Sequence, residues 1–223
     1  MRLSALLGTA CWASSVLAAF DLNRAGAVLK APAGDSFKSV TGTFTVPSLS
    51  GNNRLSIWVG IGDSLDQTYV LGGGILYNKT LSTWTAFYPS PAKDTTSSVP
   101  LKNGDSIVVT VNIAAGAGGN VTIENKTQNK KTTQTISAPA NADPERLTAL
   151  TADWFVQAYQ VTPGELVQTP SYGTVSFTAV SATTQGGKTV PATGAGAYEI
   201  QGTSGQMYSK TTISSSGISV RRQ

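Results

Sequence analysis

The stretch Ala152-Asp153-Trp154-Phe155-Val156-Gln157-Ala158-Tyr159 decides the fold of this chain. Its residues alternate with a period of two, which predicts a β-strand. One face of the strand is predicted to pack in a core: Trp154, Val156 and Ala158. The other face places an amide between two aromatic rings, with a carboxylate nearby: Asp153, Phe155, Gln157 and Tyr159. Such a face is typical of a ligand-binding groove, and the alternative is a half-buried strand whose amide bonds to a neighbour.

The rest of the chain has the composition of an extracellular all-β domain. Its 223 residues fit one domain, only 13% of them are charged, and histidine is absent. Turn signals recur roughly every 8 to 12 residues, which favours a β-sandwich over alternating strands and helices. Asp143 followed by Pro144 predicts one short helix that ends before Thr151. We therefore expect residues 20–223 to form a single β-sandwich domain.

Residues 1–19 are predicted to be a signal peptide that is cleaved after Ala18 or Ala19. Arg2 gives the positive start, Leu3 to Leu17 are mostly apolar, and small residues precede the cut. The segment is too short to span a bilayer, so we expect a secreted protein without a membrane anchor. Cys11 lies within the removed segment, which leaves no disulfide and no site where cysteine or histidine could bind a metal. We expect no cofactor.

Three Asn-x-Thr motifs predict N-glycosylation of a secreted chain, at Asn78, Asn120 and Asn125. The lysines and arginines are scattered and do not form a stripe interleaved with aromatic residues, which argues against a nucleic-acid partner. We expect a monomer.

The absence of histidine excludes the Ser-His-Asp triad and the Cys-His pair. Acid–base chemistry would have to come from carboxylates, lysine or tyrosine. The twelve acidic residues contain no Glu-x-Asp-x-Glu run, the pattern that β-sandwich glucanases often carry.

Six short blocks together resemble one enzyme family, the glutamic peptidases (eqolisins) that filamentous fungi secrete. In chain order they are Ser39 to Pro47, Trp58 to Ile61, Trp84 to Pro89, Gly104 to Ile107, Val121 to Asn125 and Gly173 to Phe177. The resemblance implies a concanavalin-like sandwich of two curved antiparallel sheets, with a groove on the concave face. It also implies an acid endopeptidase in which a glutamate activates water as general base. A glutamine of the family helps to hold that water and the oxyanion.

Both catalytic positions of the family are substituted in this chain. The family glutamine lies in a Leu-Gln-Thr-Gly context, where this chain has Leu71 followed by three glycines, so Gly72 takes its place. The family glutamate follows a tryptophan by three residues, and here that residue is Gln157. A primary amide cannot take a proton from water, and losing a general base costs about 10²–10⁴ in rate. Losing an oxyanion donor costs roughly another 10²–10³.

Three hypotheses follow from the residues and the resemblance. In the first, the chain is a catalytically silent family member whose groove binds extended peptide or glycan. In the second, it is an active acid endopeptidase with a displaced base, Asp153 or Glu199. In the third, it is a non-catalytic secreted interaction or decoy protein. The residues expected to line the groove of the first hypothesis are Trp84, Tyr88, Phe155, Gln157 and Tyr159.

Overall fold

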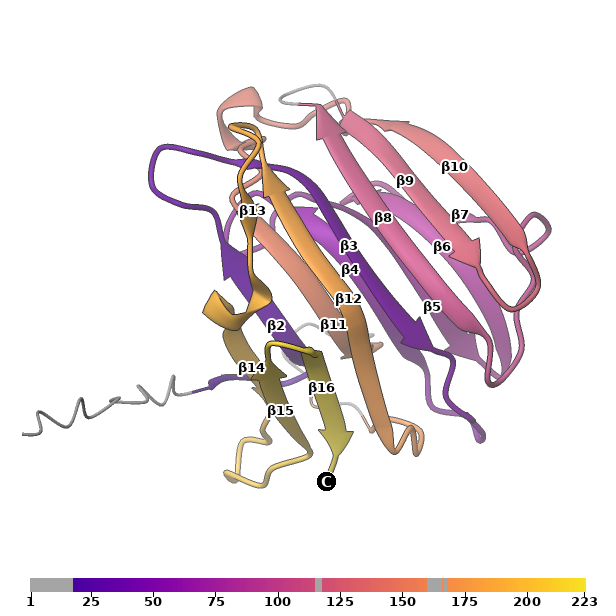
Figure 1. Ribbon diagram of the computed structural model, residues 1–223. Helices are drawn as coiled ribbons and strands as arrows, with labels where there is room; N and C mark the ends of the chain where they lie inside the picture. The colour runs from indigo at the N-terminus through magenta and orange to yellow at the C-terminus, as the bar shows by residue number, and fades with distance from the viewer. Residues whose placement is uncertain (1–17, 115–117, 160–165, 167) are drawn as a thin grey trace, which may run out of the picture.

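The computed structural model describes residues 18–114, 118–159, 166 and 168–223. Two sheets pack face to face (Figure 1). The first sheet runs, from edge to edge, through β1 (Ala19–Asp21), β14 (Gly196–Ile200), β2 (Arg24–Lys30), β11 (Thr151–Ala158), β4 (Leu55–Gly62), β5 (Val70–Asn78), β6 (Thr80–Tyr88) and β7 (Lys93–Asp94). The second runs through β10 (Lys130–Ser137), β9 (Gly118–Asn125), β8 (Ser106–Ala114), β3 (Phe37–Thr45), β12 (Thr174–Thr184), β16 (Gly217–Arg222) and β15 (Ser209–Ser214), with β13 (Thr189–Val190) beside β12.

The predicted all-β sandwich is confirmed. Its neighbouring strands are antiparallel with one exception, because β1 pairs with β14 in the parallel direction. The helix expected after Asp143 is a single 3-10 turn, Pro144–Arg146, and the Asp143 carboxylate accepts a hydrogen bond from the Glu145 N–H at 3.0 Å. A second 3-10 turn covers Ala192–Gly194. No helix in the described ranges is long and apolar enough to cross a bilayer.

Strand β11, which carries Trp154 and Gln157, lies inside the first sheet between β2 and β4. Its alternation matches the packing, because Trp154 and Val156 are fully buried between the sheets. The Trp154 indole N–H donates to the Thr41 carbonyl of β3 at 3.0 Å, so this side chain spans the two layers. Gly42 of β3 leaves room for the ring, since a Cβ there would come within 2.8 Å of it.

The predicted signal peptide falls almost entirely outside the described residues, which begin at Ala18. The first strand begins at Ala19, beside the predicted cleavage positions. Cleavage and the domain boundary at residue 20 therefore stay predictions.

Candidate functional site

The candidate site lies on the face of the first sheet that points away from the second sheet, here called the outer face. The strand register arranges its side chains in rows that run across the strands. The aromatic row contains Tyr198, Gly26, Phe155, Trp58, Gly74 and Trp84. The glycine row, next to it, contains Val28, Asp153, Gly60, Gly72 and Ala86. Arg24, Gln157, Ser56 and Leu76 form the row on the other side of the aromatic row.

The aromatic row is a packed cluster and not an open stacking platform. Phe155 is fully buried, with the Trp58 ring at 5.2 Å, the Tyr198 ring at 5.6 Å and the Arg24 guanidinium 5.3 Å from its centroid. A side chain covered on these sides cannot stack on a ligand. The structure thus corrects the expectation that Phe155 contacts ligand. Its ring packs against Trp58, Tyr198 and Arg24 instead.

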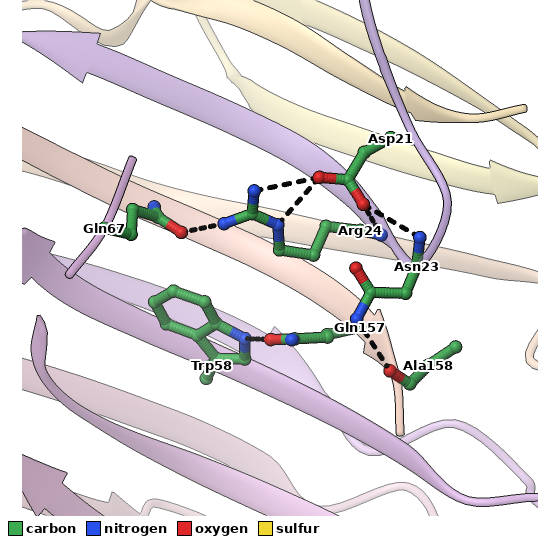
Figure 2. Close-up of polar contacts among 7 residues, drawn as sticks. All are labelled: Asp21, Asn23, Arg24, Trp58, Gln67, Gln157 and Ala158. Atoms are coloured by element: carbon green, nitrogen blue, oxygen red, sulfur yellow. Dashed lines mark hydrogen bonds and ion pairs between the residues drawn. The ribbon is translucent and has the colours of Figure 1, made fainter. Parts of the chain in front are cut away.

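Gln157 is half-buried and keeps a fixed amide orientation. The Trp58 indole N–H donates to the Gln157 side-chain oxygen at 2.8 Å, as Figure 2 shows. Since an indole N–H can only donate, the oxygen of the amide must face Trp58. The NH₂ group of Gln157 is then the end of the amide left to bind something else, and it is a donor.

Arg24 and Gln67 form a polar cover beside the aromatic row. The Arg24 guanidinium donates to the Asp21 carboxylate at 2.8 and 3.0 Å, and a third N–H donates to the Gln67 side-chain oxygen (Figure 2). Gln67 belongs to the segment that joins β4 to β5, and it adopts a left-handed backbone conformation with φ of 52°. Sequence reasoning missed both residues, because only the sheet order brings the start of β2 beside this segment.

Asp153 is a fully buried carboxyl group in the glycine row. The Thr151 hydroxyl donates to one of its oxygens at 3.3 Å, and the other oxygen has no hydrogen-bond partner among the described residues. Burial raises the pKa of Asp153 to about 8, although the Arg24 charge and the hydrogen bond from Thr151 act in the opposite direction. The group is therefore protonated at acid pH, where a general base must be ionised. Burial and the raised pKa both argue against Asp153 as the displaced base.

Gly72 and Gln157 share the outer face but are not cross-strand neighbours. Gly72 lies on β5 in the glycine row, opposite Gly60, whereas Gln157 lies on β11 opposite Ser56, with the aromatic row between them. A Cβ atom at Gly72 would come within 2.9 Å of the Val59 carbonyl oxygen, so a side chain there requires β4 to shift. The close approach of β4 and β5 therefore favours glycine at this position.

Of the other predicted site residues, Trp84 belongs to the aromatic row, and Tyr88, Tyr159 and Glu199 lie outside it. Trp84 is half-buried in the aromatic row and donates to the Ser56 hydroxyl at 3.2 Å. Tyr88 is 56% exposed at the end of β6, and Tyr159 is 45% exposed beyond the end of β11, with the Arg54 guanidinium 5.0 Å from its ring centroid. Glu199 is buried and pairs with Lys210 at 3.0 Å, which removes it as a free base on the outer face.

We now expect two of the three predicted glycosylation motifs to be occupied. Asn78 and Asn120 are exposed. Asn125 is fully buried, and its side-chain NH₂ donates to the Pro100 carbonyl at 2.9 Å and the Asp105 carboxylate at 2.8 Å. Attaching a sugar would replace one of the two hydrogens that make these bonds, at a nitrogen that is buried in the fold. Glycopeptide mass spectrometry of protein secreted from a eukaryotic host should find sugar on Asn78 and Asn120, and a glycan on Asn125 would contradict this.

Residues 22–222 match the model of the Peptidase A4 family. Aspergillopepsin-2 of Aspergillus niger is 31% identical, with 90% of this chain and 77% of that protein covered. Scytalidopepsin B of Scytalidium lignicola is 29% identical, with 64% of this chain and 54% of that protein covered. The fold is similar to the crystal structure of scytalido-glutamic peptidase with a transition state analog inhibitor, with a TM-score of 0.78, 26% identity and coverage of 90% and 98%. It is also similar to that of aspergilloglutamic peptidase from Aspergillus niger, with a TM-score of 0.66, 30% identity and coverage of 76% and 99%. The chain therefore belongs to the Peptidase A4 family, the glutamic peptidases or eqolisins.

Proposed function

We propose that this chain is a secreted, non-hydrolytic member of the Peptidase A4 family that binds an extended peptide on the outer face. Gln157 is the central residue of the proposal. Its NH₂ group donates to a carbonyl oxygen of the ligand, while Trp58 holds its oxygen. The observation that carries the proposal is the 2.8 Å hydrogen bond from the Trp58 indole to the Gln157 oxygen, because it turns a donor outward at the position of the family base.

The carboxyl groups on the strands of the first sheet support the absence of a general base. There are four in the described strands: Asp21, Asp94, Asp153 and Glu199. Asp21 is paired with Arg24, and Glu199 with Lys210. Asp153 is buried and protonated at acid pH. Asp94 lies on the edge strand β7, with three strands between it and β11.

A peptide is a better ligand for this face than a glycan. Structures of the related scytalido-glutamic peptidase hold a peptide-based transition state analog, and a related eqolisin holds the tripeptide Ala-Ile-His. On the outer face of this chain the aromatic rings are partly or wholly covered, so they offer little flat surface for sugar stacking. An amide donor, by contrast, matches the carbonyl groups that recur along a peptide.

The purified protein is expected to leave denatured protein substrates intact between about pH 2 and 5. Gln157→Glu alone should also be inactive, because it supplies a carboxylate while Gly72 still lacks the partner amide. Product formation is followed by mass spectrometry, with aspergillopepsin-2 as the positive control. Hydrolysis by the wild-type protein that is insensitive to pepstatin and survives Asp153→Asn would overturn the proposal and also exclude Asp153 as the base.

Binding is the second arm of the test. Peptide fragments of a denatured protein are titrated into the protein at acid pH. Their binding should change the fluorescence of Trp58, which lies beside Gln157. Gln157→Leu should weaken binding roughly threefold to tenfold, the range of one hydrogen bond. Gln206→Leu, an exposed glutamine on the turn between β14 and β15, is the matched control and should bind like the wild type. Equal affinity of Gln157→Leu and wild type would show that the donor plays no part.

A further inference from the structure

A hollow of about 400 Å³ lies beside the first residue of β11, at the other end of this strand from Gln157. Three segments surround it: residues 30–35, where the loop after β2 begins, residues 64–65 after β4, and residues 150–151 at the start of β11. The loop after β2 is the long indigo connection to β3 in Figure 1. The volume falls within the range of about 300–1,000 Å³ that is typical of small-molecule sites.

The walls of the hollow are largely apolar. Leu65 and Leu150 line it and are 40% and 41% exposed, and Ala31 and Pro32 complete the apolar part. Two leucines that remain this exposed around one hollow would gain burial from an aliphatic ligand group placed between them.

The hollow also carries one cation without an ionic partner. Lys30 lines it and forms no ion pair with any residue in the described ranges. The other charged residue of the wall, Asp35, is satisfied by its own surroundings. Its carboxylate accepts from the Ser36 N–H at 2.8 Å and the Gly186 N–H at 3.4 Å. Both groups stay charged, but the Asp35 carboxylate already accepts two hydrogen bonds, whereas Lys30 has no ionic partner among the described residues. The Lys30 ammonium is therefore the group of the wall that is left to pair with a ligand.

We propose that this hollow binds the C-terminal residue of a peptide with an aliphatic side chain. The terminal carboxylate pairs with the Lys30 ammonium, and the side chain lies between Leu65 and Leu150. The site goes beyond the proposed function, because Thr151 and Gln157 are six residues apart on β11, which is about 20 Å along an extended strand. A ligand of one or two residues in the hollow cannot reach Gln157.

The probe is N-acetyl-alanyl-leucine, compared with its C-terminal amide, in isothermal titration near pH 6, where a terminal carboxyl group is ionised. The free acid is expected to bind, and the amide to bind roughly threefold to tenfold more weakly. Lys30→Gln should weaken binding of the free acid by the same factor, and Lys30→Arg should retain it. Lys38→Gln, an exposed lysine of β3 outside the hollow, is the matched control and should bind like the wild type.

Three results would each overturn the proposal: no binding of the free acid, equal binding of acid and amide, or full affinity in Lys30→Gln. A loss of binding in Gln157→Leu would also overturn it, because the probe would then sit on the outer face. The test is separate from that of the proposed function, since longer fragments can fail to bind at Gln157 while this probe still binds at Lys30.

Discussion

Replacing Trp154 with alanine is expected to lower the free energy of unfolding by about 3–5 kcal/mol, the range for removing a large buried aromatic side chain. Trp154 is fully buried on the middle of the first sheet and donates to the Thr41 carbonyl on the second. Its removal leaves a cavity between the layers and deletes the hydrogen bond to Thr41. Both effects act at the junction of the two sheets, so the loss should exceed that of any other single aromatic truncation on β11.

The measurement is urea unfolding at constant pH, followed by far-ultraviolet circular dichroism. Gly42→Ala tests the same contact from the second sheet. The added Cβ would come within 2.8 Å of the Trp154 ring. It should be destabilising in the wild-type background and close to neutral when combined with Trp154→Ala. A loss below about 1 kcal/mol for Trp154→Ala would show that this side chain does not hold the sheets together.

Replacing Asp153 with asparagine is expected to remove most of the pH dependence of stability between about pH 4 and 8. The folded state raises the pKa of Asp153 to about 8, chiefly through burial, whereas an unfolded aspartate titrates near 3.9. Between these values the folded protein holds a proton that the unfolded chain has released. The free energy of unfolding then falls as the pH rises, by up to about 1.4 kcal/mol per pH unit for one proton. Asparagine is neutral throughout and avoids this loss.

Thermal unfolding at a series of pH values checks the expectation. The wild-type melting temperature should fall from about pH 5 to pH 8, and Asp153→Asn should melt higher than the wild type at pH 8 by an amount equivalent to several kcal/mol. Asp94→Asn, at an exposed position, is the control and should keep the wild-type trend in this range. A wild-type curve that rises toward pH 8, with no difference from Asp153→Asn, would mean that Asp153 is ionised in the fold.

The part of the site that the sequence reveals is the identity of each residue. Gln157 is an amide whatever its surroundings, and that alone excludes proton abstraction by this residue. The alternation along β11 likewise predicts the burial of Trp154, because the period of two fixes which side chains share a face. The sequence also places a helical segment after Asp143, since the Asp-Pro signal is local, although the expected short helix is a single 3-10 turn.

Other properties depend on strands that are far apart in the sequence. Asp153 looks like a candidate base from its place beside Trp154, yet Arg24, Thr151 and Gln67 enclose it and burial keeps it protonated. Phe155 looks like a ligand contact, yet Trp58 and Tyr198 cover it. Asn125 carries a valid glycosylation motif, yet its amide is bonded to Pro100 and Asp105.

The sequence by itself determined the sandwich, the family and the absence of histidine, because periodicity, motif order and residue identity are all properties of the chain. Only the tertiary structure decided which groups face solvent, which way the Gln157 amide points and which carboxyl group holds a proton. Those properties depend on burial and on partners that the sheet order supplies, and neither can be read along one strand.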